Sequence, residues 1–339
     1  MKQPPTVTAG PSAGATLAER TGTPRLSFAG DADKHAKKAL IYAIEFATGR
    51  RKLEQLYAGM INTPACKHSF WEAALNALQV KLVYSRAPLA AVPATGPVVL
   101  IANHPYGVLD GLTMCYLASQ LRPNFRILVN AALCREERIA DHVLPIDFTV
   151  TEAATRTNIE SKRKAVEVLR TGGALVIFPA GAISTAISPF GQVTDMEWKL
   201  FAARAIQTSK ATVLPVFFHG HNGRLFQLVS QFSQTLRLSL IIYEVTKMIG
   251  RPLNLHIGEP ISYAKLAAFN SRKDLIDHLR QVTYALGGIP QPDPVRYKRY
   301  ENNFVRKMKA SAAPAVEHYA TCGSIDRCCL LLRLSKSSL

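Results

Sequence analysis

The sequence predicts an α/β fold in which a mixed β-sheet is covered by helices. From Val80 onward, short apolar runs typical of buried strands alternate with amphipathic helical patterns. Several of these runs end in turns of glycine, proline and polar residues, and ligands bind beyond the carboxyl ends of strands in open α/β sheets. The 339 residues, of which 48% are hydrophobic and 19% charged, are enough for one large domain or two small ones.

The N-terminal part is predicted to contain a disordered segment followed by helices. Residues 1–30 are rich in Pro, Thr, Ala and Gly without an apolar period, so we expect disorder there. Residues 31–79 are expected to be helical. Ala36–Tyr57 has a basic face and is interrupted at Gly49, which predicts two short helices or one kinked helix, and Phe70–Leu78 has amphipathic spacing.

Residues 80–290 form the predicted α/β domain. The strand candidates are Lys81–Tyr84, Val98–Ala102, Arg126–Asn130, Ala174–Phe178, Thr212–Phe217 and Leu253–Ile257. The helical patterns are Ile159–Arg170, Glu197–Gln207 and Arg272–Leu286. Residues 291–339 are predicted to be a basic C-terminal tail. Within it, Arg296–Lys309 holds six basic residues and is either a solvated basic helix or a membrane-surface patch.

The formal net charge of +17 indicates a preference for anionic partners such as nucleic acid, an anionic membrane or a phosphorylated substrate. We expect no nucleic-acid partner, because the chain has neither zinc-finger spacing nor an aromatic-basic recognition signature. Two long stretches without charged side chains, Ala87–Leu109 and Thr171–Thr194, are interrupted by proline or glycine. Neither is therefore predicted to span a membrane.

The six cysteines show no metal-ligand spacing, and three of them sit in apolar or mixed segments, where buried free thiols are the usual explanation. No secretory signal is recognisable at the N-terminus, so the chain is expected to reside in a reducing cytosol.

The stretch VVLIANHPYGVLDG, from Val98 to Gly111, places a histidine at the end of an apolar strand. Pro105 and Gly107 predict a turn that lets Asp110 fold back towards His104. A carboxylate that accepts from one imidazole nitrogen fixes the tautomer and leaves the other nitrogen free as a general base. A structural histidine that caps the turn is the alternative. No Gly-x-Ser-x-Gly nucleophile elbow is present, which disfavours a covalent hydrolase.

Two further strands also run into polar turns. Ala174–Phe178 continues through Pro179 and Gly181 to Ser184, and Val213–Phe218 is followed by His219-Gly-His-Asn-Gly-Arg224. Three such turns at one sheet edge would build a shared cleft. A metal site that combines His104 with the two later histidines lacks a nearby acidic partner in the sequence, so no metal is predicted.

The order of these blocks resembles the glycerolipid (lysophosphatidate-type) acyltransferases, and especially their bacterial haemolysin-like and ornithine-lipid branch. The resemblance covers roughly residues 75–265. It rests on Asn103-His-Pro-x-Gly-x-x-Asp-Gly111, on Phe-Pro-x-Gly from Phe178, on His221–Phe226, and on Leu236–Glu244 followed by Ile257–Ile261.

The resemblance implies an O-acyltransferase with an acyltransferase fold. The acyl donor would be acyl-ACP or acyl-CoA as co-substrate, with no further cofactor. The acceptor would be a lyso-lipid, either lyso-ornithine-lipid-like or a lysophospholipid. The enzyme would work peripherally at an anionic membrane surface, on the cytoplasmic face of the inner membrane.

The resemblance also assigns site residues. His104 would deprotonate the acceptor hydroxyl, and Asp110 would orient and charge-stabilise His104. From their position in the chain, and not from the resemblance, Arg135 and Arg138 are candidates to bind a head group or the carrier's phosphates, because they follow a strand. A solvated loop is the alternative. Substrate-binding candidates are Asn103, Gly107, Arg135, Phe178, Pro179, Gly181, Ser184 and Arg224, with Arg224 as a positive group on the cleft rim and Ser184 as a ligand or a turn residue.

Two departures from the family pattern matter. Five residues separate His104 from Asp110 where the wider family has four, and Gly107 lets the turn bulge. Ala180 stands where the family's Phe-Pro-Glu-Gly block has glutamate, with no arginine beside it. An amino-acid-containing lyso-lipid is therefore favoured over a glycerol phosphate. A thioester hydrolase and a catalytically silent lipid-binding protein are the alternative functions.

Overall fold

The computed structural model describes residues 49–131, 136–149, 151–186, 191–230 and 234–289. Within these residues it contains a seven-stranded sheet in the order β1-β9-β8-β2-β5-β3-β4 and a small hairpin of β6 and β7. The strands are β1 (Lys81–Val83), β2 (Val98–Ala102), β3 (Phe125–Asn130), β4 (Val143–Ile146), β5 (Ala174–Ile177), β6 (Thr185–Ala186), β7 (Val193–Thr194), β8 (Thr212–Phe218) and β9 (Pro252–Ile257). The predicted mixed α/β fold is confirmed.

Strand direction brings several strand ends together. β2 pairs in parallel with both β5 and β8, β5 pairs in parallel with β3, and β3 with β4. β9 runs antiparallel to β8, and β1 runs parallel to β9, which makes the sheet mixed. The carboxyl ends of β2, β5 and β8 therefore lie side by side at one edge, as the predicted shared cleft requires.

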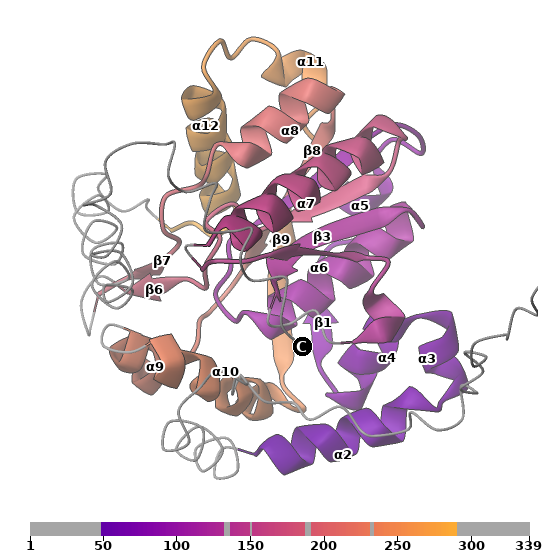
Figure 1. Ribbon diagram of the computed structural model, residues 1–339, viewed down its shortest axis with the longest axis vertical. Helices are drawn as coiled ribbons and strands as arrows, with labels where there is room; N and C mark the ends of the chain where they lie inside the picture. Colours follow the sequence, from indigo (N-terminus) through magenta and orange to yellow (C-terminus); the bar gives the residue numbers. More distant parts are fainter. Residues whose placement is uncertain (1–48, 132–135, 150, 187–190, 231–233, 290–339) are drawn as a thin grey trace, which may run out of the picture.

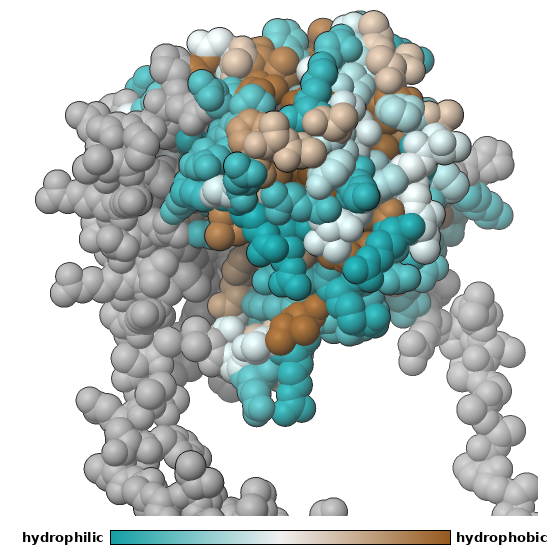
Figure 2. Space-filling model, turned by 90° about the horizontal axis from the view of Figure 1, so that it is seen from above, coloured by the Kyte–Doolittle hydropathy of each residue, from teal (hydrophilic) through white to brown (hydrophobic). Residues whose placement is uncertain are grey.

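Helices cover both faces of the sheet (Figure 1). One face carries α2 (Arg50–Ile61), α3 (Pro64–His68), α4 (Phe70–Ala77), α6 (Val108–Leu121) and α10 (Gln234–Met248), and the other carries α7 (Glu152–Arg170), α8 (Phe201–Ser209) and α12 (Arg272–Ala285). The remaining helical segments are α5 (Ala87–Ala90), η2 (Glu137–Ile139), α9 (Arg224–Ser230) and α11 (Tyr263–Leu266). Seen from the α8 and α12 end, the surface is mostly hydrophilic, with hydrophobic side chains in smaller patches (Figure 2).

The central strand β2 shows why its sequence is a continuous apolar run. All five of its residues are buried. Val98, Leu100 and Ala102 pack into the core on the α6 side of the sheet. Val99 and Ile101 pack into the second core against α7, α8 and α12. A strand covered on both faces has no solvent-facing positions, so its sequence does not alternate.

Several elements differ from the prediction. The helix predicted over Ile159–Arg170 begins earlier, at Glu152, and helix α10 was not predicted. The helix predicted from Glu197 begins at Phe201, because the preceding residues form no regular secondary structure and Lys199 N donates to the Pro179 carbonyl. Helix α6 was not predicted, since it is buried on nearly all sides and lacks an amphipathic pattern. Strand β4 was not predicted because Pro145 interrupts its apolar run, although proline is tolerated in a strand at a sheet edge.

At the ends of the chain, only part of the prediction can be compared. Helix α2 starts directly after its N-cap Gly49, which has a φ of +99°. Residues 1–48 and 290–339, including the basic stretch Arg296–Lys309, lie outside the described residues. The domain boundaries stay predictions. In the part of the chain that the structure describes, no helix combines the length and the apolar character needed to cross a membrane.

Candidate active site

His104 lies just beyond the carboxyl end of β2. Its Nδ1 is 3.1 Å from Asp110 Oδ2, and 17% of its side chain is exposed. The imidazole stacks on the Phe178 ring, which follows β5, with ring centroids 3.9 Å apart and an interplanar angle of 24°. Because Nδ1 faces the carboxylate, Nε2 is the ring nitrogen left to meet a substrate. The predicted fold-back of Asp110 onto His104 is present.

Asp110 occupies the first turn of α6. Its Oδ2 accepts hydrogen bonds from Tyr106 N at 2.8 Å and Gly107 N at 2.9 Å. The side chain is fully buried, and Oδ1 has no hydrogen-bond partner among the described residues. Burial raises the pKa of the Asp110 carboxyl above its usual value, while His104 and the two backbone amides partly oppose that rise. This carboxylate is therefore a costly group held in one orientation.

Gly107 makes the turn possible. It is the N-cap of α6 with φ 79° and ψ −104°, a backbone conformation that residues with a Cβ avoid. A Cβ at this position would lie 2.7 Å from Ile183 Cδ1. Gly107 therefore serves the turn through its backbone.

The second loop follows β5 and packs against the first. Gly181 has φ +70°, and its N donates to the Phe178 carbonyl at 2.9 Å, which closes a turn over Pro179. The Ala180 side chain is 4% exposed and belongs to the core on the α8 side of the sheet. Ala180 is thus a core residue of this loop.

Ser184 and Asp195 connect this loop to the backbone of His104. Ser184 N donates to the His104 carbonyl at 2.8 Å, and Ser184 Oγ donates to Asp195 Oδ1. The same Oδ1 accepts from His104 N at 3.1 Å. Asp195 was not predicted as a site residue. Its sequence signal is slight: it is the first charged residue after the uncharged stretch from Thr171 to Thr194.

The third loop follows β8. The Asn103 amide donates to the Phe218 carbonyl at 3.0 Å and accepts from Phe218 N at 2.7 Å, so it ties β2 to β8. Tyr106 Oη donates to the His219 carbonyl at 2.9 Å. Burial, with the charges of Asp110 and Glu244, raises the pKa of Tyr106 to about 12. Tyr106 therefore acts as a neutral donor that fastens this loop to the His104 turn.

The predicted arginines are not gathered at His104 by the contacts of the described residues. Arg224 is exposed at the start of α9. Arg138 bonds Glu136 at 3.2 Å and lies 3.4 Å from the Tyr57 hydroxyl, and neither of these partners is a predicted site residue. Arg135 lies outside the described residues. The structure therefore brings together the predicted residues of the first and second loops, which are Asn103, His104, Gly107, Asp110, Phe178, Pro179, Gly181 and Ser184. The contacts of the described residues do not place the predicted arginines beside them.

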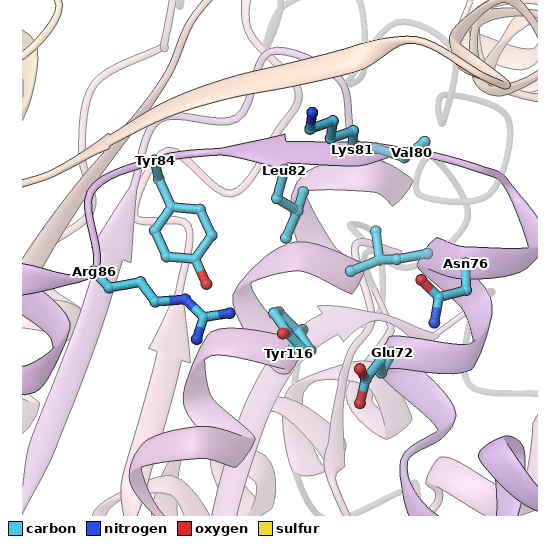
Figure 3. A pocket seen from close by; sticks show the side chains of 9 residues that line it. Glu72, Asn76, Val80, Lys81, Leu82, Tyr84, Arg86 and Tyr116 are labelled. Atoms are coloured by element: carbon cyan, nitrogen blue, oxygen red, sulfur yellow. The ribbon is translucent and has the colours of Figure 1, made fainter.

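A separate cavity of about 240 Å³ lies between α4, β1 and α6. The side chains of Tyr84, Arg86 and Tyr116 point into it (Figure 3). No residue of the predicted site lines this cavity. This cavity is therefore not part of the predicted site.

Comparison with known proteins identifies the family. Residues 61–289 match the family described as "Acyltransferase", and this match spans more than half of the chain. The chain belongs to this acyltransferase family. The resemblance to the glycerolipid acyltransferase superfamily that the motifs predicted is thereby confirmed, and the protein is an acyltransferase.

Two relatives are similar over much of this acyltransferase. A lyso-glycine lipid O-acyltransferase of Phocaeicola vulgatus is 26% identical over 226 residues, which cover 64% of this chain and 77% of the relative. A protein of the same name from Bacteroides thetaiotaomicron is 25% identical, covering 64% of this chain and 79% of the relative. Among solved structures, the 1-acyl-sn-glycerophosphate (LPA) acyltransferase PlsC of Thermotoga maritima aligns with a TM-score of 0.42 and 15% identity, covering 75% of this chain and 98% of that one.

Gly107 in the His104 turn and Gly111 in helix α6 should respond oppositely to an alanine substitution in their free energy of unfolding. Gly107→Ala should lower the free energy of unfolding by at least about 1–2 kcal/mol, because it combines a left-handed φ with a contact to Ile183. Gly111→Ala, inside α6 with open space around the new Cβ, should raise it by about 0.5–1 kcal/mol. Urea unfolding measures both. Equal effects of the two substitutions would contradict this account of the turn.

Proposed function

We propose that this acyltransferase moves a fatty acyl group from a thioester of CoA or acyl carrier protein to the hydroxyl of a lyso-lipid with an amino-acid head group. The observation that carries the proposal is the His104–Asp110 pair, 3.1 Å apart at the sheet edge where three strands end. The names of the two bacterial relatives, both lyso-glycine lipid O-acyltransferases, support a lyso-lipid acceptor.

In the proposed reaction, His104 Nε2 takes the proton of the acceptor hydroxyl while that oxygen attacks the thioester carbonyl carbon. The new C–O bond forms an ester, the C–S bond breaks, and the imidazolium returns the proton to the departing thiolate. Asp110 offsets the positive charge that develops on the imidazole. Phe178 restricts the ring to one plane by stacking on it.

Transfer in this scheme is direct, without an acyl-enzyme. Ser184, which carries the hydroxyl of the second loop, is 2% exposed and donates to Asp195. An acyl-enzyme would need a nucleophile activated by the histidine. The environment of Ser184 supports attack by the acceptor itself.

The second loop supports an acceptor other than a glycerol phosphate. The family's glutamate position is taken by Ala180, which is buried in the core on the α8 side. A phosphate monoester carries about −1.5 to −2 charges and requires several well-placed donors. The Phe178–Ser184 loop contains no cationic side chain to supply them. A head group with a single carboxylate makes a smaller demand.

The first test of the proposal concerns the base. His104→Ala should lower turnover by about 10²–10⁴-fold in a protein that remains folded. Asp110→Asn should cost at most as much as the histidine substitution. The assay measures acylated lipid and free fatty acid together. Wild-type transfer by folded His104→Ala would remove the mechanism, and release of free acid alone would indicate a thioester hydrolase.

Asp110→Asn also separates catalysis from stability. Burial raises the folded-state pKa of Asp110, so above the ordinary aspartate pKa the ionised carboxylate opposes folding. The asparagine variant should therefore keep or raise the free energy of unfolding at pH 7 while turnover falls. A marked loss of stability at pH 7 would show that the lost turnover has a structural cause.

The second test concerns the acceptor. With one acyl donor, a lyso-lipid that carries an amino-acid head group should be acylated in preference to lysophosphatidate, because the second loop lacks the charged pair of the wider family. Parallel assays with both acceptors decide. A preference for lysophosphatidate that is abolished by Arg135→Ala or Arg224→Ala would place a phosphate site in other loops and overturn the acceptor assignment.

The third test concerns the membrane. We propose peripheral attachment at the cytoplasmic face of the inner membrane, supported by the net charge of +17 and by basic stretches such as Arg50-Arg51-Lys52 at the start of α2. The protein should sediment with anionic vesicles, and salt should weaken this binding, since each basic contact contributes about 1 kcal/mol. Equal sedimentation with neutral vesicles would exclude the electrostatic attachment.

A further inference from the structure

We propose that Asp195 is a positioning residue that fixes the backbone of His104 for acyl transfer. Asp195 follows the β6–β7 hairpin, far from His104 in sequence, and its side chain is fully buried. Its Oδ1 accepts from His104 N at 3.1 Å and from Ser184 Oγ. The inference rests on the proposed function for its effect on turnover, whereas the contacts themselves are independent of the substrate.

Both main-chain polar groups of His104 are set by this pair of residues. Asp195 accepts from the His104 amide, while Ser184 N donates to the His104 carbonyl at 2.8 Å. Because Ser184 is itself bonded to Asp195, the residues His104, Ser184 and Asp195 form a closed triangle of hydrogen bonds, which we call the clamp. The imidazole is thus placed from two sides: Asp110 contacts the ring, and Asp195 with Ser184 holds the backbone that carries it.

Asp195 is anchored by groups that do not contact His104. Trp198 Nε1 donates to Asp195 Oδ2 at 2.9 Å. Asp195 N donates to the Tyr284 hydroxyl at 2.7 Å, and Arg280 Nη2 donates to the Asp195 carbonyl at 3.1 Å. Tyr284 and Arg280 both belong to α12, on the opposite face of the sheet from α6. These contacts therefore connect the backbone of His104, through Asp195, to helix α12.

The chemistry of the contact favours positioning over stability. A buried carboxylate has to be removed from water, and replacing a buried charged group by apolar packing is often neutral or stabilising. The Asp195 carboxylate has two acceptor oxygens. They accept from three donors in separate segments, His104 N, Ser184 Oγ and Trp198 Nε1. A general base misplaced by about 1 Å loses on the order of 10²-fold in rate. The clamp removes that freedom from His104.

The experiment compares Asp195→Asn with wild type by two measurements. The asparagine amide has one acceptor oxygen and one donor nitrogen. Its NH2 group must face either Trp198 Nε1 or the side of His104 N and Ser184 Oγ, so two donors meet and the hydrogen bonds of the clamp weaken. Hydrogen exchange of the His104 amide, followed in the segment Asn103–Gly107, should become about tenfold faster or more. Turnover should fall about 10–10²-fold while KM changes less than about twofold, since the acceptor contacts are not altered.

Two further variants keep the test decisive. Ser184→Ala removes one side of the triangle and should change exchange and turnover in the same direction by a smaller factor, which serves if Asp195→Asn does not fold. Ser161→Ala is the matched control, because it removes a buried hydroxyl that donates to the Pro145 carbonyl at 2.7 Å, outside this network. Ser161→Ala should leave the exchange of the His104 segment and the turnover unchanged.

The outcomes separate this inference from the proposed function. Unchanged exchange and turnover in both Asp195→Asn and Ser184→Ala would overturn it, as would an equal loss of turnover in Ser161→Ala. Faster exchange in Asp195→Asn, with no acylation of a lyso-glycine lipid by the wild-type protein, would support the clamp and reject the proposed acceptor. Faster exchange together with a fall in turnover, at nearly constant KM, supports both.

Discussion

Oδ2 of Asp110 accepts from two backbone amides of the turn and lies 3.1 Å from the His104 ring. The local structure follows from this arrangement. Asp110 reaches back to these amides from the first turn of α6. The helix begins directly after Gly107, its N-cap, which has a positive φ. Strand β2, Gly107 and helix α6 together place the Asp110 carboxylate beside the His104 ring.

This arrangement has an energetic cost that the rest of the fold offsets. Asp110 is fully buried with one oxygen unpaired, and Thr113 on the next turn of α6 also has a buried hydroxyl without a partner among the described residues. Such groups are costly in a core, and they gather at functional sites. They are tolerated here because α6 packs into an apolar core and β2 is covered on both faces. The apolar packing of the helices on the sheet thus offsets the unfavourable burial of polar groups in the turn.

The parts of the fold that were predictable are those with a strong local pattern. The runs Val98–Ala102, Ala174–Phe178 and Thr212–Phe217 read as buried strands because a strand covered on both faces is apolar throughout. Helix α6 gave no signal for the same reason: a helix buried on nearly all sides has no period. The His104–Asp110 pair was predictable because one turn holds both residues. Asp195 was not, since its link to His104 depends on how distant loops meet.

Position 180 shows how the choice of acceptor is tied to packing in this chain. Ala180 lies in the core on the α8 side, and the neighbouring Pro179 carbonyl accepts from Lys199 N. A glutamate in that orientation would bury a carboxylate with no partner, which costs several kcal/mol or forces the loop to move. The loop therefore accommodates a small apolar residue at position 180, and under the proposed function the groups that select the head group come from another loop. The His104 imidazole contacts this loop through Phe178, and the His104 backbone contacts the loop through Ser184, whereas the Ala180 side chain faces the core on the α8 side. A change at position 180 therefore does not alter the contacts of the His104 ring directly. In the proposed mechanism the same His104–Asp110 pair would serve acceptors with different head groups, and the surrounding loops would select among them.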